Sequence, residues 1–121
     1  MHLPSMTSDA LRILRVEEER RLFKINSIVH SIYPQVLKIA KHSRDKVYHH
    51  EIHFADRVFY STNATAILAG LKELFPDAHI SHTLLARGTD GKLYDIARLN
   101  DDTLRLVTKA NNNSYIVIDW S

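Results

Sequence analysis

The sequence predicts a single α+β domain with N-terminal helices, one further helix, and an antiparallel sheet that ends in a C-terminal β-meander. Apolar residues recur at helical spacing in the first third of the chain, whereas short β-prone runs separated by polar turns fill the second half. The chain has 121 residues, of which 45% are hydrophobic and 25% charged. This length and composition are those of one domain, spanning residues 1–121, that buries its own core.

We expect helix from about residue 8 to 44. Ser8 is a candidate N-cap, and Asp9 lies in the first turn, where the helix dipole favours an acid. Pro34 lacks a backbone donor, so a kink or break at residues 31–33 is expected, and the segment then forms two helices on one core. About the first 20 residues either pack on the domain or extend from it as a helical arm.

The middle of the chain is expected to hold a strand, a second short strand and a helix. Alternation begins at Val47, which predicts a strand, and the β-prone run at residues 58–60 predicts its hairpin partner. Thr62 is expected to cap the next helix, and Pro76 to end it. The buried stripe of that helix is predicted to be Ala64, Ile67, Leu68, Leu71, Leu74 and Phe75.

Antiparallel strands are predicted for the remainder. The strongest turn signal is the pair Asp90 and Gly91. The final run, Tyr115–Trp120, is apolar on both faces, so we expect it in the middle of the sheet, with helices on one side and a partner or second layer on the other. Strands are expected over 79–87, 93–98 and 103–109, with a polar break at 100–102 and a last turn at 111–114.

Composition argues against several functional classes. No run is long and apolar enough to span a bilayer, and residues 1–9 lack the apolar stretch of a secretory signal, so we expect a cytoplasmic protein without a membrane partner. Without cysteine, the chain has no thiolate zinc site or Cys nucleophile. Its three glycines form no phosphate-binding loop, and no Ser-His-Asp frame is recognisable. We therefore expect no enzymatic activity and no cofactor.

One apolar seam within the first helical segment is the best candidate for an interface. Its residues follow one another at spacings of 3, 4, 3, 4 and 3. The seam forms either the domain's own core or a contact with a second copy or another protein, and we expect the protein to act through such contacts as a homo-oligomer. The residues are Leu22, Ile25, Val29, Ile32, Val36 and Ile39.

The alternative function is nucleic-acid binding by the basic stretch 38–57. All of the excess positive charge lies in the first half of the chain, and four bases in this stretch have one acid, Asp45, beside them: Lys38, Lys41, Arg44 and Lys46. Neighbouring aromatic residues would stack on bases if they stood on an open sheet face. Alternatively, the bases are a solvated surface and the aromatics belong to the core.

Histidines raise the question of a metal site. His49, Glu51 and His53 share one face of the predicted strand, and two imidazoles with a carboxylate form a ligand set for zinc or iron. The spacing lacks the His-Glu-x-x-His pattern of zinc proteases. We favour a solvated strand face and expect no metal.

Four segments together carry a resemblance. They are Ile32–Leu37, Leu71–Asp77, Asp90–Ile96 and Tyr115–Ser121. In this order they resemble small uncharacterised proteins of large nucleocytoplasmic DNA viruses, over roughly residues 25–121. The resemblance implies an accessory, interaction or virion role in an infected cell, and it implies no catalytic or binding residue.

Overall fold

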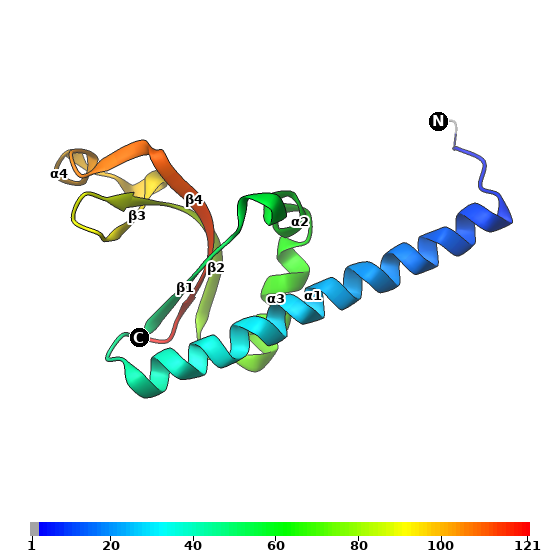
Figure 1. Cartoon of the computed structure of the whole chain (residues 1–121), viewed down its shortest axis with the longest axis horizontal. Helices are drawn as coiled ribbons and strands as arrows, with labels where there is room; N and C mark the ends of the chain where they lie inside the picture. The colour runs from blue at the N-terminus through cyan, green and yellow to red at the C-terminus, as the bar shows by residue number, and fades with distance from the viewer. Residues whose placement is uncertain (1–2) are drawn as a thin grey trace.

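Figure 1 shows the chain as a computed structural model, which describes residues 3–121 apart from the side chains of residues 108–111. The first two residues of the predicted domain lie outside the described residues. The predicted α+β class is confirmed. The elements in chain order are α1 (Ser8–His42), β1 (Val47–Glu51), the 3-10 turn η1 (Phe54–Asp56), α2 (Arg57–Thr62), α3 (Ala64–Leu74), β2 (His79–Gly88), β3 (Leu93–Asp95), the 3-10 turn η2 (Ile96–Arg98), α4 (Asp101–Leu104) and β4 (Val107–Asp119).

The four strands form one antiparallel sheet in the order β1-β4-β2-β3. As predicted from its two apolar faces, the last strand lies in the middle, with Ile118 opposite Tyr48 on one side and Ile80 on the other. The strand order is not the predicted meander, because β4 pairs with β2 rather than with its predecessor β3. Gly91, with a φ of 81°, turns the chain between β2 and β3.

The core lies between one face of the sheet and helices α1 and α3, which cross beside it in Figure 1. Gly70 of α3 lies close to Val29 of α1, since a Cβ at Gly70 would come within 3.0 Å of Val29 Cγ2. The lack of a side chain here lets the two helices approach. The largest fully buried side chains are Ile32, Ile52, Ile67, Leu71, Ile116 and Ile118.

The predicted break at residues 31–33 is wrong, because α1 is one α-helix of 35 residues with Pro34 inside it. Burial of the neighbouring side chains explains why the helix tolerates this proline. Ile32 and Val36, on either side of the proline, are exposed by only 0% and 4%, and this packing offsets the lost backbone bond. The N-cap is Thr7 rather than Ser8, with Thr7 Oγ1 accepting from Ala10 N over 3.1 Å.

The predicted strand at residues 58–60 is also wrong, since this run lies in α2. His53 Nδ1 accepts from Ala55 N over 3.2 Å, and the 3-10 turn η1 begins there and leads directly into the helix. Tyr60 is buried in the core. Tertiary packing therefore overrides the β propensity of these residues. The next helix, α3, begins after Asn63 instead of Thr62.

Three predictions in the last third are wrong as well. Residues 101–104 form α4, held by a capping box in which Asn100 Oδ1 accepts from Thr103 N and Thr103 Oγ1 accepts from Asn100 N, each over 2.9 Å. The predicted strand 93–98 ends at Asp95, which caps η2. The predicted turn at 111–114 is wrong, because Asn112, Asn113 and Ser114 lie within β4 and pair with β2, whose register with β4 shifts between Ala86 and Gly88. Pairing satisfies these backbone groups, so the polar side chains do not end the strand.

Candidate functional site

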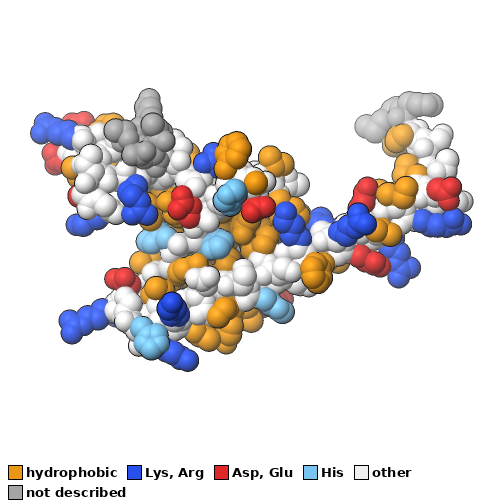
Figure 2. Space-filling model, viewed as in Figure 1, with side chains coloured by type: hydrophobic (Ala, Val, Ile, Leu, Met, Phe, Trp, Pro, Cys, Tyr) orange, Lys and Arg blue, Asp and Glu red, His pale blue; other side chains and the backbone are white. Residues whose placement is uncertain are grey.

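The N-terminal part of α1 extends away from the sheet and from the other helices (Figure 1). We call residues 8–24 the arm. Its first buried neighbour along the helix is Ile25, and its apolar side chains are largely exposed: Leu11 by 54%, Leu14 by 48% and Leu22 by 47%. In Figure 2 the arm carries hydrophobic side chains between charged ones. Large apolar side chains in this number on one projecting element are typical of an interaction surface.

The exposed leucines of the arm continue the helix face that packs into the core. Residues three or four apart lie on one side of a helix, and Leu11, Leu14, Leu22 and Ile25 fall on such a line. From Ile25 toward the C-terminal end of α1, this face is buried in the domain's own core. N-terminal to Ile25, the leucines of the line are exposed by 47% to 54%. A second exposed line of Ile13, Val16 and Phe23 lies on the other side of the arm.

The predicted interface residues divide into two groups. Ile25, Val29, Ile32 and Val36 are buried in the chain's own core, so they cannot meet a partner while the domain is folded. Ile39 is half-buried, and Leu22 is exposed. The surface available for contact therefore consists of Leu22 of the predicted seam and of apolar residues N-terminal to it, which the sequence analysis did not assign to an interface. The sequence does carry a signal for this extension, since Leu11 and Leu14 continue the helical spacing of apolar residues toward the N-terminus.

Charged residues on the arm pair within the helix. Glu18 interrupts the apolar line between Leu14 and Leu22, and the hydrogen bond from Arg21 lowers the pKa of its carboxyl group. These exposed pairs add little stability, but they fix where each charge lies along the arm. The pairs are Arg12 with Asp9 at 2.9 Å, Arg15 with Glu19 at 3.3 Å, and Arg21 with Glu18 at 2.9 Å.

Contacts with α2 and η1 hold the base of the arm. Arg21 Nη1 donates to Asn63 Oδ1 over 2.8 Å, and Lys24 Nζ lies 3.5 Å from Asp56 Oδ1. The ammonium group of Lys24 also lies 4.3 Å from the centre of the Phe59 ring, a cation–π distance. The arm is therefore anchored at its C-terminal end.

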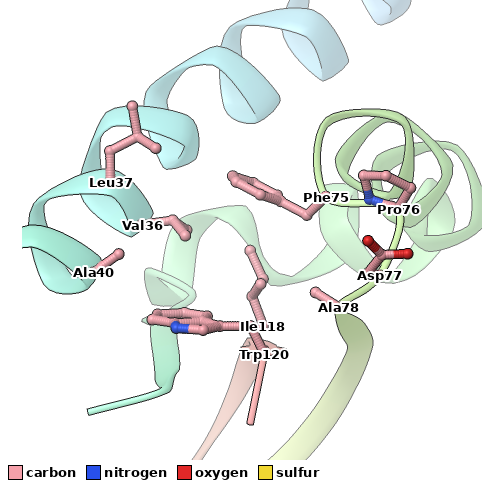
Figure 3. Close-up of a pocket in the computed structure, with 9 residues that line it drawn as sticks. All are labelled: Val36, Leu37, Ala40, Phe75, Pro76, Asp77, Ala78, Ile118 and Trp120. Atoms are coloured by element: carbon pink, nitrogen blue, oxygen red, sulfur yellow. The ribbon is translucent and has the colours of Figure 1, made fainter. Parts of the chain in front are cut away.

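An apolar pocket lies at the other end of α1, with a volume of about 320 Å³. Figure 3 shows that the rings of Phe75 and Trp120 extend toward α1, with Ile118 between them. Tyr33 stacks on Phe75 with ring centroids 5.6 Å apart, which restrains the Phe75 ring. The remaining residues of the wall are Val36, Leu37, Ala40, Pro76, Asp77 and Ala78.

The four predicted nucleic-acid-binding residues lie near the C-terminal end of α1 and in the loop before β1: Lys38, Lys41, Arg44 and Lys46. All four are exposed, and within the described part of the chain none forms a salt bridge. Lys41 lies in the last turn of α1, where the helix dipole favours a cation. The aromatics Tyr48 and Tyr60 point inward to His50, so they form no open stacking face.

His49, Glu51 and His53 do not come together as a ligand set. His49 lies edge-on to the ring of Tyr115, Glu51 Oε1 accepts from Asn113 Nδ2 over 2.9 Å, and His53 caps η1 beyond the end of the strand. Among the described side chains, no group of three or more His, Cys, Asp or Glu residues is placed to hold a metal ion.

His50 instead bridges two tyrosines on the helix-covered side of β1. Tyr48 Oη lies 3.1 Å from His50 Nδ1, and Tyr60 Oη lies 3.3 Å from His50 Nε2. Burial lowers the pKa of His50, so the neutral ring is favoured, with one nitrogen as donor and the other as acceptor. Burial also raises the pKa of Tyr60 to about 12.

Comparison with protein-family models, with curated proteins and with solved structures finds no match for this chain. A search of the described helices for a segment able to cross a membrane finds none. Two surfaces of the described chain are candidates for function, namely the arm and the apolar pocket.

Proposed function

We propose that this protein is a non-enzymatic protein-interaction module that self-associates through the arm of α1. One observation carries the proposal: a single helix face is buried in the core from Ile25 onward and is uncovered at Leu11, Leu14 and Leu22. The arm is about 25 Å long at 1.5 Å per residue. An isolated helix of this length is only marginally stable in water. Pairing with another helix would bury its apolar line and stabilise it.

Charge order along the arm favours a second copy as the partner. In an antiparallel pair whose arms cross between Val16 and Glu17, Leu11 of one copy faces Leu22 of the other. In the same register Arg15 faces Glu18, so opposite charges lie beside the apolar contact, and Arg12 faces Arg21, each of which already pairs with an acid of its own helix. An accessory or virion role, which the resemblance of the four segments implies, is compatible with such an assembly.

Sedimentation equilibrium across a range of protein concentrations tests the proposal. The wild-type chain is expected to associate, and Leu11→Lys and Leu22→Lys are each expected to weaken association on the order of tenfold. Leu104→Lys is the matched control, because Leu104 is exposed by 52%, close to the 54% of Leu11, but lies in α4 outside the arm. A monomer at every concentration, or equal loss in the control, contradicts the proposal.

Cysteine pairing tests the register. The chain has no cysteine of its own, so single variants introduce the only thiols. A mixture of Leu11→Cys and Leu22→Cys chains is expected to form mixed disulfides faster than either variant forms a disulfide with itself. Preferential self-pairing of each variant would show a parallel arrangement and contradict the antiparallel register.

Nucleic-acid binding is the competing outcome. Fluorescence anisotropy with mixed-sequence DNA and RNA at two salt concentrations measures it directly. On our proposal no salt-dependent binding is expected. Binding that weakens steeply with salt, and that is lost on charge reversal in Lys41→Glu and Arg44→Glu, would assign the function to the basic end of α1 instead.

A further inference from the structure

A polar pocket lies between α2 and the sheet, away from both the arm and the apolar pocket. Its volume is about 360 Å³, at the small end of the range for ligand sites. Helix α2 forms one wall, and strands β2 and β4 form the other. The wall contains one guanidinium, one imidazole, three hydroxyl groups and no carboxylate. Its residues are Arg57, Val58, Ser61, Thr62, His82 and Ser114.

Arg57 differs from the other cations of the described chain. Among the described lysine and arginine side chains, only Arg21 and Arg57 are half-buried, and the others are exposed. Arg21 pairs with Glu18 at 2.9 Å, whereas no described carboxylate lies within salt-bridge distance of Arg57. The ring of Phe54, 5.6 Å from Arg57 Cζ, offers a cation–π contact but no negative charge. Because a charge partly removed from water is costly unless it is compensated, this position favours an anion.

An amide holds the guanidinium in place and separates it from the nearest acid. Arg57 Nε and Nη2 donate to Asn113 Oδ1 over 3.0 and 2.6 Å. Asn113 Nδ2 donates to Glu51 Oε1 over 2.9 Å, so the carboxylate is engaged on the far side of the amide. Asp56, next to Arg57 in sequence, lies 3.5 Å from Lys24 Nζ. A guanidinium has further N–H donors, and those of Arg57 have no partner among the described residues.

The other polar side chains of the wall add donors on both sides of the pocket. His82 pairs with Ile116, which follows Ser114 by two residues, so His82 and Ser114 lie on the same face of the sheet. The hydroxyl groups of Ser61 and Thr62 lie on the opposing wall, in α2. Within the described part of the chain, these four side chains form no hydrogen bond with protein groups, so all of them are available to a ligand.

We propose that this pocket binds a phosphoryl group, with Arg57 as its charged partner and the neighbouring hydroxyl and imidazole groups as donors to its oxygens. A tetrahedral phosphoryl group directs acceptor oxygens to several sides, so it can engage both walls at once, which a planar carboxylate cannot. The group comes either from inorganic phosphate or from a phosphorylated serine side chain. The proposal does not depend on the arm or on self-association.

Proton–nitrogen NMR correlation spectra of the full chain locate the site directly. Inorganic phosphate is added at constant ionic strength, with chloride as the balancing ion. We expect saturable shifts that are largest at the backbone amides of Ser61, Thr62 and Ser114. Acetate, titrated in the same way, is expected to bind about fivefold more weakly, because it offers fewer acceptor oxygens. Largest shifts at Lys41 and Arg44, equal affinity for acetate, or no saturable shift would each overturn the proposal.

Matched variants test the charge. Arg57→Gln is expected to weaken phosphate binding about tenfold, because it removes a charged hydrogen-bond donor. Arg105→Gln is the control, since Arg105 is an exposed arginine after α4 and outside the pocket wall, and it should leave the affinity unchanged. Equal loss in both variants would attribute the binding to general surface charge and overturn the assignment.

A third variant keeps the test independent of the folding of Arg57→Gln. Ser61→Ala leaves the bonds between Arg57 and Asn113 in place and changes an exposed position. It is expected to weaken phosphate binding about threefold through the loss of one hydroxyl donor. Unchanged affinity in this variant contradicts the proposed pocket.

A second titration distinguishes the sources of the phosphoryl group. Acetylated phosphoserine amide and inorganic phosphate are compared on the wild-type chain. Tighter binding of the phosphoserine derivative points to a phosphorylated protein partner, and tighter binding of inorganic phosphate points to a free anion. Either result supports a phosphoryl site, and failure of both ligands contradicts it.

Discussion

Arg21 and Asn63 join the arm to the domain, through a 2.8 Å hydrogen bond from Arg21 Nη1 to Asn63 Oδ1. Asn63 is exposed by only 8%, and its Nδ2 donates to Phe59 O over 3.0 Å. The Asn63 side chain thus accepts a hydrogen bond from α1 and donates one to α2. This contact lies close to Ile25, the first buried residue of α1.

Removing that amide should destabilise the domain. Asn63→Ala loses both hydrogen bonds and leaves the Phe59 carbonyl without its side-chain donor, so we expect unfolding free energy to fall by about 1 to 2 kcal/mol. Urea unfolding followed by circular dichroism measures the change. Asn26→Ala, at an exposed position of α1, is the control and should alter stability little. Equal effects of the two substitutions would contradict the role of Asn63 as a junction.

The two halves of the apolar line on α1 should respond differently to truncation. Ile32→Ala opens a cavity at a fully buried position, and we expect a loss of about 2 to 5 kcal/mol of unfolding free energy. Leu14→Ala removes a side chain that is 48% exposed and should change unfolding of the monomer little. Urea unfolding at low protein concentration keeps the comparison free of association. A large loss in the Leu14 variant would place the arm within the core.

Stability should fall as the pH drops through the ordinary pKa of histidine. Burial lowers the pKa of His50 below 6.5 in the folded chain. The unfolded chain then binds a proton at pH values where the folded chain does not, so acid favours unfolding. Urea midpoints are compared one pH unit above and one below 6.5. His50→Gln should reduce the difference between the two midpoints, and an unchanged difference would assign it to other groups.

At alkaline pH, Tyr60 should ionise late. Its pKa of about 12 in the folded chain, against 10.0 for an ordinary tyrosine, follows first from burial and then from the nearby charge of Asp56. Stability from the neutral hydroxyl is complete below pH 10 and is lost as the pH rises toward 12. Phenolate absorbance of wild type and Tyr60→Phe should therefore differ by a late-titrating group. A difference that titrates at the ordinary value would contradict the buried bridge.

Substitution of Gly88 should disturb the β2–β3 hairpin. A Cβ at this position would lie 2.8 Å from Tyr94 Cε2 and 3.3 Å from the backbone oxygen of Leu106. We expect Gly88→Ala to lower the unfolding free energy by about 1 to 3 kcal/mol, because the added Cβ would also lie 2.6 Å from Asp90 Oδ1, and Asp90 and Tyr94, which hydrogen-bond to each other, would both have to shift. Leu84→Ala, at an exposed position of the same strand, serves as the control for thermal unfolding. No difference between the two would contradict the tight packing at Gly88.

Sequence patterns alone predicted the α+β class, the helical conformation of most of residues 8–44, the Asp90–Gly91 turn and the central place of the last strand. Each follows from a local rule: helical spacing of apolar residues, the freedom of glycine at positive φ, and an apolar strand on both faces. The local signal of the capping box at Asn100 and Thr103 was also readable in the sequence, and the strand predicted over 103–109 overlooked it.

The remaining features depend on contacts between elements that are distant in the chain. Pro34 continues the helix because Ile32 and Val36 are buried on both sides of it, and residues 58–60 are helical because Tyr60 enters the core. The helical spacing is the same at Leu11 and Ile32, so the sequence could not say which part of the line is covered. The covered part is set by how far α3 and the sheet reach along α1. Burial depends on contacts between elements that are distant in the chain, so local spacing cannot predict it.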